Sequence, residues 1–494
     1  MRTSLAQSAG KALTWRIVEL GGVRLISLVR FFILAKLLAP DDFGLLAIAA
    51  VAVELSLSLT DLGLIESLIQ HRAPDRRLYD VAWTVELIRA CVVFGVLLSG
   101  APLIAQVFGD PRAAPILRGL SVATFLASIA SIRTADFTRE LRFAPVAALE
   151  LASALVEAVV SIALARALGV WALVIGQIAA AIVRTGMSWL LAPYQPRLVR
   201  DLDAARPLLA FGRWVFVAVV VGAAGDLFLR AVVSRRLGTA DLGLYYVAFR
   251  LAMLPKQVVS DLVQPVAFPV FARLQDTPSE AARVYRSTIL AMAGMLMPAY
   301  ALLATLAPSL VSTLLGPRWA SSVGIIQLLS AAGCVSLVTE CTIPLVTGLG
   351  RPHFAALVFG VRSALVVGLV SWLAGAYGIR GAALAWLLAE TGVQIVAVAT
   401  ARRTLRRPLS TLGVPIVGIT VISGIGALVA WAIDVAVGGR SGLLAAALTA
   451  SAAMLVLLLL LDRHLRLGFG AAVMLVSRRL GAFPYGPSAR ATDA

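Results

Sequence analysis

The sequence predicts an all-α polytopic membrane protein with about 14 transmembrane helices, arranged as two parallel-repeat six-helix lobes followed by two C-terminal helices. Composition, recurrent apolar stretches and an internal repeat predict this class. Hydrophobic residues make up 60% of the 494 residues and charged residues 14%, whereas about a quarter of a soluble domain is charged. Stretches of roughly 20 apolar residues, long enough to cross a bilayer as a helix, recur throughout. The short alternating segments typical of membrane barrels are absent from the sequence.

The predicted spans cover residues 15–38, 43–69, 80–107, 113–132, 145–166, 169–192, 208–233, 241–271, 283–306, 320–347, 353–376, 379–401, 410–436 and 441–461. The predicted organisation is an N-lobe (1–192), a cytoplasmic linker rich in Pro and Arg (193–207), a C-lobe (208–403), accessory spans 13 and 14 (404–463) and a cytoplasmic basic tail (464–494).

The net charge is +17, and its distribution predicts orientation. Lys and Arg fall mostly in alternate short loops between the spans, as the positive-inside rule requires of cytoplasmic loops. This pattern predicts a multi-pass membrane protein with an even number of spans and both termini in the cytoplasm. It also accounts for the basic residues, so we expect no nucleic-acid partner.

The two lobes are predicted from an internal repeat. Three pairs of segments match in the same order: 42–45 with 241–244, 108–112 with 315–318, and 168–173 with 377–382. The offset grows slowly from 199 to 209. Each pair falls in the same loop of a six-helix unit, after its first, third and fifth spans. An even number of spans gives both copies the same orientation, and hence a parallel repeat.

The first span carries ionisable residues, which in a membrane mark functional or paired positions. Arg16, Glu19, Arg24 and Arg30 lie within an arc of about 140° on one face of this helix. A guanidinium keeps its charge and binds phosphate oxygens through a planar fork. The predicted cargo-binding residues are Arg24, Arg30, Arg16, Arg89, Arg184 and Arg250. Snorkelling to the headgroups is an alternative for Arg16 and Arg30.

Carboxylates inside the spans are the candidates for ion or proton coupling. Two pairs are seven residues apart on one helix face, and the four residues are Glu54, Asp61, Glu150 and Glu157. Local ion pairs are the structural alternative for some charges. Glu86 with Arg89 (i, i+3) and Asp226 with Arg230 (i, i+4) have the spacing for pairs within one helix.

Motifs of enzymes and metal sites are missing from the sequence. It contains no phosphate-binding G-x-x-x-x-G-K-[ST], no H-E-x-x-H and no G-x-S-x-G. Its three cysteines and three histidines are scattered rather than spaced as metal ligands. We therefore predict no catalytic residue, metal or cofactor. Loops of about fifteen residues at most also disfavour a membrane-embedded polymerase or ligase.

Several motifs together resemble those of a known family. They are FILAKLLAPDDFGL at 32–45, TDLGL at 60–64, LIQ at 68–70, RELRF at 139–143, GVWAL at 169–173, LGLY at 242–245 and LLGPRW at 314–319. The ordered set is similar to Wzx-type oligosaccharide flippases of the multidrug/oligosaccharidyl-lipid/polysaccharide (MOP) exporter superfamily. The resemblance implies a protein of the bacterial inner membrane with two lobes around a cationic cavity, alternating access and an undecaprenyl-diphosphate-linked oligosaccharide as cargo. A polysaccharide polymerase and co-polymerase are its implied partners in O-antigen, capsule or exopolysaccharide assembly.

Two alternatives within the superfamily stay open at this point. One is a lipid II flippase, and the other is a MATE-like drug/cation antiporter, for which an acidic rather than an arginine-rich first span would be expected. Gene neighbours separate the first reading from the second, because glycosyltransferases accompany oligosaccharide flippases.

Overall fold

The computed structural model describes residues 2–60, 64–70, 75–140, 142–199, 213–351, 353–405 and 412–465, and every regular element in them is helical. The N-terminal helices are α1 (Arg2–Leu37), α2 (Pro40–Thr60), α3 (Leu64–Gln70), α4 (Arg76–Phe108), α5 (Ala113–Ser128), α6 (Thr134–Arg139), α7 (Phe143–Leu168) and α8 (Val170–Leu191). The later ones are α10 (Arg213–Leu237), α11 (Thr239–Arg273), α12 (Pro278–Leu310), η2 (Val311–Leu315), η3 (Pro317–Trp319), α13 (Ser322–Val335), α14 (Leu337–Gly348), α15 (His353–Leu405), α16 (Gly413–Val437) and α17 (Gly439–Leu465). This confirms the predicted helical class.

The arrangement is compatible with the predicted fourteen spans. Eight of the described helices are long and apolar enough to cross a membrane, or nine if α13 and α14, which meet at a bend of 44°, form one span. One of the eight, α15, contains two predicted spans joined at Gly378, whose φ of 58° and ψ of −142° interrupt the helix. The helices α1, α10 and α11, which also contain predicted spans, fall outside this set.

Backbone geometry supports the third pair of repeat segments. Gly169 joins α7 to α8 with φ 55° and ψ −130°, and Gly378 joins the two parts of α15 with φ 58° and ψ −142°. Such positive φ angles favour glycine because it lacks a Cβ. Equivalent positions of the two segments therefore make the same sharp connection between successive helices.

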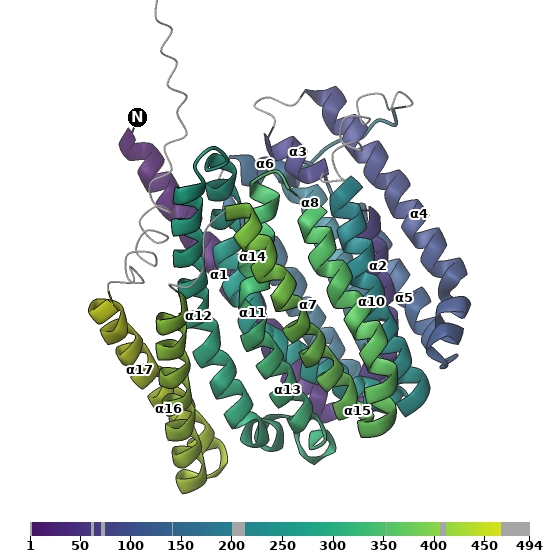
Figure 1. Cartoon of the computed structure of the whole chain (residues 1–494). Helices are drawn as coiled ribbons and strands as arrows, with labels where there is room; N and C mark the ends of the chain where they lie inside the picture. The colour runs from purple at the N-terminus through teal and green to yellow at the C-terminus, as the bar shows by residue number, and fades with distance from the viewer. Residues whose placement is uncertain are drawn as a thin grey trace, which may run out of the picture.

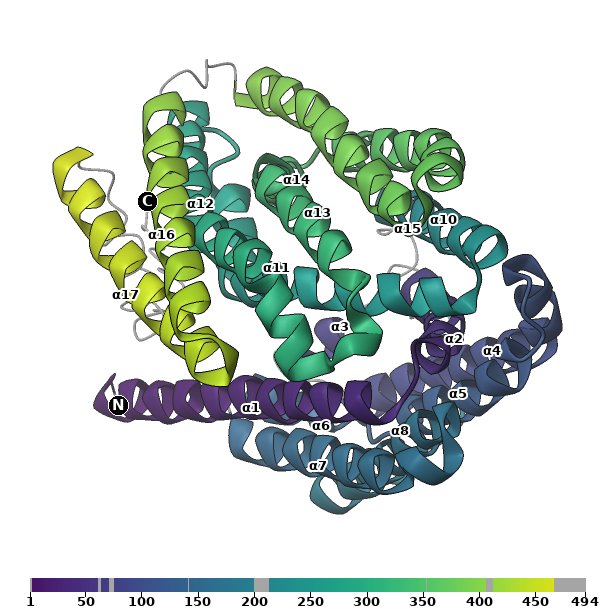
Figure 2. The ribbon, with the colours of Figure 1, turned by 90° about the horizontal axis from the view of Figure 1, so that it is seen from below.

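The helices form a bundle in which α1–α8 pack mainly on one another and α10–α15 do likewise (Figures 1 and 2). We call these sets the N-terminal and C-terminal halves. The principal contact between them is α2 against α11, with smaller contacts of α10 on α2 and α4. Helices α16 and α17 pack on α12 at one side of the bundle, beyond both halves (Figure 2). The exact domain boundaries remain predictions.

The segment that follows α8 lies against the start of α4. The Tyr194 hydroxyl donates to the Asp80 carboxylate, and the Arg197 backbone N–H donates to Asp80 Oδ1 over 3.0 Å. The first part of the predicted linker is thus attached to the N-terminal half. The rest of the linker from residue 200, and the basic tail from residue 466, lie outside the described residues.

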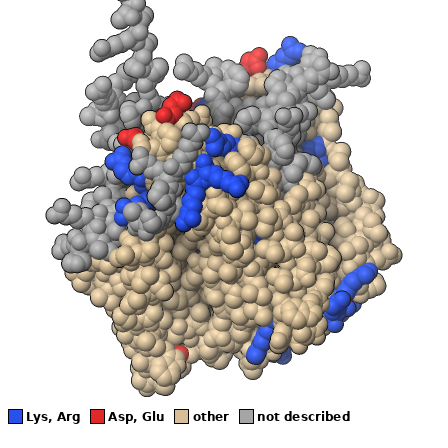
Figure 3. Space-filling view, viewed as in Figure 1, with Lys and Arg blue, Asp and Glu red and all other residues tan. Residues whose placement is uncertain are grey.

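Charged side chains are sparse in the middle of one face of the molecule. On the face shown in Figure 3, Lys and Arg lie near the two ends, and a broad band of other residues separates them. Many large apolar side chains along the helices are exposed, among them Leu190 at 81% and Trp372 at 69%. Exposure of this kind is stable in lipid rather than in water. The surface is that of a multi-pass membrane protein.

Candidate functional site

The two halves meet in a reciprocal glycine contact at the end of the bundle where α1 passes into α2. A Cβ atom on Gly44 would lie 1.9 Å from the Thr239 carbonyl oxygen, and a Cβ on Gly243 would lie 1.8 Å from the Pro40 carbonyl oxygen. Gly44 and Gly243 are 199 positions apart, as are Pro40 and Thr239. We call these four residues the seam. Each predicted copy of the repeat thus contributes the same two positions, and only glycine permits so close an approach.

A buried tryptophan reinforces the seam from the C-terminal half. Trp319 is fully buried, its Nε1 donates to the Ala35 carbonyl oxygen over 2.8 Å, and its ring meets Phe43 edge-on at 5.3 Å between centroids. The Ala35 carbonyl lies in the last turn of α1, where helical carbonyls lack partners within their own helix. The indole therefore caps α1 from the opposite half.

A carboxylate outside the spans also crosses between the halves. The Thr239 hydroxyl donates to Asp110 Oδ2 over 2.6 Å, and Arg112 binds both oxygens of Asp110. The hydrogen bonds from Arg112, helped by Thr239, lower the pKa of Asp110 from its ordinary 3.8, although burial opposes this. Asp110 is therefore ionised at neutral pH, and it holds the start of α11 beside the end of α4.

Three arginines lie two helical turns inward from the seam. Arg30 precedes the end of α1 by seven residues, Arg230 precedes the end of α10 by seven, and Arg250 follows Gly243 by seven. Seven residues span about 10 Å of helix. The arginines lie at similar depth on helices of both halves, and we call them the arginine layer. The sequence predicted Arg30 and Arg250 as site residues but not Arg230.

Each member of the layer has a different environment. Arg30 forms an ion pair with Glu157 of α7 within the N-terminal half. Arg250 donates to the Tyr246 hydroxyl over 3.3 Å and lies over the Phe31 ring of α1, 5.5 Å from its centroid. Arg250 thus contacts the opposite half through an aromatic face, an interaction that strengthens when it is desolvated.

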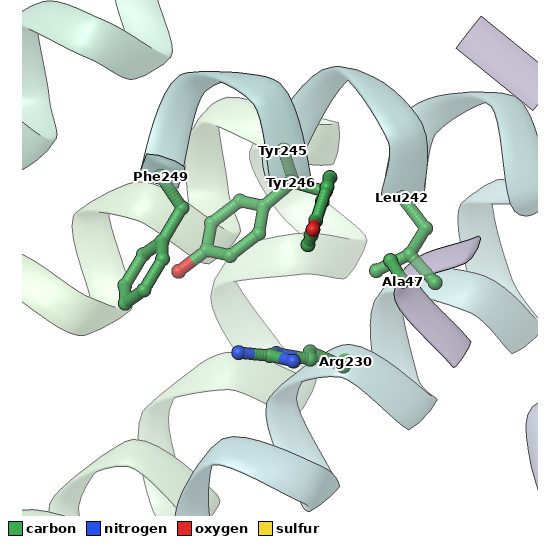
Figure 4. Close-up of a pocket in the computed structure, with 6 residues that line it drawn as sticks. All are labelled: Ala47, Arg230, Leu242, Tyr245, Tyr246 and Phe249. Atoms are coloured by element: carbon green, nitrogen blue, oxygen red, sulfur yellow. The ribbon is translucent and has the colours of Figure 1, made fainter. Parts of the chain in front are cut away.

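Arg230 lies beside a carboxylate of the opposite half. Its Nη1 is 3.7 Å from Glu54 Oε2 on α2, so the predicted pair with Asp226 of its own helix gives way to an approach across the halves. Its guanidinium lies below the aromatic side chains of α11 (Figure 4) and is 6.0 Å from the Phe249 centroid. Tertiary packing, rather than helical spacing, sets this contact.

A second bridge between the halves lies farther from the seam. Arg24 of α1 forms a hydrogen-bonded ion pair with Asp261 of α11. Both are partly exposed, Arg24 at 34% and Asp261 at 51% of their side chains. The sequence predicted Arg24 as a cargo contact but did not predict Asp261 as a site residue.

The remaining candidates lie within the N-terminal half. Arg16 pairs with Glu19 at 2.6 Å, Arg184 of α8 pairs with Glu150 of α7 at 2.8 Å, and Arg89 pairs with Glu86 as the i, i+3 spacing predicts. Asp61 lies outside the described residues. Their predicted roles in binding or coupling remain predictions.

Two observations in the sequence would have pointed to residues that were missed. Asp261 is a carboxylate in a span that contains three prolines, and the sequence marks Gly44 and Gly243 only as matching positions of the repeat. Their significance depends on which helices cross, which sequence spacing does not give. Across the described residues, no group of three His, Cys, Asp or Glu side chains has the arrangement of a metal site.

Comparisons with known proteins agree with this geometry. A family model described as "Polysaccharide biosynthesis protein" matches residues 33–324. The succinoglycan biosynthesis transport protein ExoT of Rhizobium meliloti is 27% identical over 402 residues, 79% of each chain. The lipopolysaccharide biosynthesis protein WzxC of Escherichia coli is 26% identical over 320 residues, 63% of this chain and 64% of that protein.

Solved structures share the fold. A lipid II flippase MurJ in an inward closed conformation matches with a TM-score of 0.70 at 15% identity, over 92% of this chain and 99% of that one. A multidrug resistance MATE transporter of the MOP superfamily, in an inward-facing conformation, matches with a TM-score of 0.59 at 15% identity, over 80% of this chain and 98% of that one. At this identity the likeness shows the fold alone.

Proposed function

Because this chain belongs to the polysaccharide biosynthesis protein family, we propose that it is a transporter that flips an undecaprenyl-diphosphate-linked oligosaccharide across the bacterial inner membrane. The cargo moves from the cytoplasmic to the periplasmic leaflet and supplies the assembly of a cell-surface polysaccharide. One observation carries the assignment to an anionic cargo: three arginines from both halves lie at one depth beneath a closed seam.

The arginine layer suits a diphosphate. A charged side chain inside a membrane protein is costly unless it is paired or faces water, and Arg30 is paired with Glu157. A phosphate offers oxygens to which an arginine fork binds bidentately. Cargo phosphates therefore compete for guanidinium groups that the protein already holds in position.

The seam supports transport by alternating access. It closes the end of the bundle that the distribution of Lys and Arg assigns to the periplasm. Cargo entering from the cytoplasmic leaflet meets the arginine layer before it reaches the seam. Release on the other side then requires α2 and α11 to separate, and a two-state element of this kind is what a transporter needs.

The alternative cargoes fit less well. A cation antiporter needs carboxylates that are free to bind its substrate, whereas Glu54, Glu150 and Glu157 each lie within 4 Å of an arginine. Lipid II shares the lipid diphosphate, so the layer does not separate it from other lipid-linked sugars. A polymerase and co-polymerase working beside the transporter complete the proposal.

A flipping assay in proteoliposomes tests this function. A fluorescent undecaprenyl-diphosphate-linked sugar is placed in both leaflets, and its accessible fraction is followed with a membrane-impermeant quencher. We expect the fraction to rise with this protein and to stay constant in protein-free liposomes. Equal rates in the two preparations would contradict the proposal. Lipid II in the same assay separates the two cargo classes.

A further inference from the structure

Resting on the proposed function, we infer that Arg230 is the residue that receives a phosphate of the cargo, and that the Glu54 carboxylate occupies the place of that phosphate while the site is empty. Arg230 comes from α10 of the C-terminal half and Glu54 from α2 of the N-terminal half. Cargo binding would therefore replace a contact between the halves.

Two buried groups near Arg230 lack a hydrogen-bond partner among the described residues. Arg230 Nη1 is buried and has no hydrogen-bond partner, and the Tyr245 hydroxyl is likewise buried without one. Both residues line one small pocket, whose other walls are Ala47, Leu242, Tyr246 and Phe249 (Figure 4). Leaving a buried donor unsatisfied is costly, so such groups indicate a missing water, ion or ligand.

The contact between Arg230 and Glu54 is weak. Glu54 Oε2 lies 3.7 Å from Arg230 Nη1, which is beyond hydrogen-bonding distance. The Glu54 side chain is 65% exposed, whereas that of Arg230 is 12% exposed. Glu54 is thus near Arg230 without being one of the residues that line the pocket. The arginine stays in place through its aromatic neighbours when the carboxylate leaves.

Arg24 and Arg30 have closer acidic partners than Arg230 has. Arg24 is hydrogen-bonded to Asp261, and Arg30 forms a close ion pair with Glu157. A phosphate must break these contacts to bind there. At Arg230 it displaces an exposed carboxylate that makes no hydrogen bond, and it supplies the acceptor that Nη1 lacks. The net gain from an anion is therefore larger at Arg230.

The position of Arg230 links phosphate binding to the seam. Arg230 lies two turns from the seam, and its neighbours Ala47 and Leu242 each lie within one turn of a seam glycine. While Glu54 faces Arg230, opposite charges draw α2 toward α10. A phosphate on Arg230 removes that attraction and leaves Glu54 beside a new anion. Binding at this pocket therefore favours separation of the halves, which is the direction that release requires.

The test measures binding of undecaprenyl diphosphate to the full-length protein in lipid nanodiscs, with neutral undecaprenol as the control lipid. A hydrogen bond to a charged group changes affinity by about tenfold or more. We expect Glu54→Gln to bind the diphosphate about tenfold more tightly and Arg230→Gln to bind it about tenfold more weakly. Glu54→Gln in the Arg230→Gln background should give no tightening. None of these changes should alter the affinity for undecaprenol.

Controls keep the result interpretable. Arg118→Gln removes an exposed arginine of α5 and should leave the affinity unchanged. The tighter binding of Glu54→Gln is a gain that a misfolded protein would not show. If the wild type prefers the diphosphate to undecaprenol but neither variant changes that preference, the inference on Arg230 is wrong and the proposed function stands. If the wild type shows no such preference, the proposed cargo and the inference both fail.

Discussion

Replacing Gly44 with alanine tests whether the seam is the periplasmic gate. Real Cβ atoms essentially never come closer than 3.0 Å to other heavy atoms, and this one would be 1.9 Å from the Thr239 carbonyl oxygen. The obstructing atom is backbone, so no side chain can turn aside. Helices α2 and α11 must move apart by about 1 Å before the closed state forms.

The expected effect is a shift of the equilibrium toward the open seam. Overpacking of this kind costs about 1–3 kcal/mol. The cost falls on the closed state alone, because an open seam has no such contact, and every 1.4 kcal/mol is about a tenfold change in population. Gly44→Ala should therefore raise the ratio of open to closed molecules by about five- to 140-fold. Gly243→Ala should do the same, since its Cβ would lie 1.8 Å from the Pro40 carbonyl oxygen.

Cysteine labelling from the periplasmic side measures this shift. After replacement of the native cysteines, the reporter is Ser234→Cys, a nearly isosteric change at a side chain 6% exposed whose hydroxyl bonds the Phe108 carbonyl across the halves. We expect a membrane-impermeant maleimide to label it slowly, and much faster with Gly44→Ala. Gly95→Ala is the matched control, because a Cβ there meets nothing within 4 Å. Equal labelling of the Gly44→Ala and Gly95→Ala proteins would refute the gate.

Three further predictions concern contacts between the halves. Reversing one charge of the Arg24–Asp261 pair should lower polymer export. The double exchange Arg24→Asp with Asp261→Arg should restore part of it. If export is not restored, Arg24 acts in some way other than by pairing with Asp261. Asp110→Asn should lower the thermal midpoint by an amount that is constant from pH 8 to pH 5 and disappears well below pH 3.8, because a depressed pKa stabilises the fold only while the carboxyl is ionised. A constant difference at all pH values would contradict this. Trp319→Phe should lower the free energy of unfolding in denaturant by about 1–3 kcal/mol, because the Ala35 carbonyl loses its buried donor. An unchanged denaturant midpoint would mean that water satisfies this carbonyl and would contradict the prediction.

The sequence was a good guide to features that depend on local chemistry. Apolar length gave the helical membrane class, and the glycines at 169 and 378 marked equivalent connections because their backbone angles favour that residue. The Glu86–Arg89 pair follows from spacing on one helix. Each of these properties belongs to a stretch of a few residues, so the surrounding fold does not alter it.

Contacts between distant helices were beyond the same reasoning. The i, i+4 spacing predicted that Arg230 pairs with Asp226, but the carboxylate within 4 Å of Arg230 is that of Glu54 on α2. Glu54 was predicted as an ion-coupling residue from its spacing to Asp61 on one helix, and that spacing gives no sign that Arg230 lies nearby. The seam required knowledge that α2 crosses α11 at their first turns, which neither helix encodes alone.

The pairing of the buried arginines also bears on how a transporter releases its cargo. A free guanidinium out of water would bind a phosphate so strongly that release would be slow, since the alternative is an unpaired charge. With Glu157 beside Arg30 and Glu54 near Arg230, the carboxylate returns as the phosphate leaves, so the arginine is at no stage without a counter-ion. The net affinity is then the difference between two ion pairs, small enough for turnover. On this reasoning Glu54→Gln should bind cargo more tightly and transport it more slowly, whereas tighter binding with faster transport would show that release does not limit the cycle.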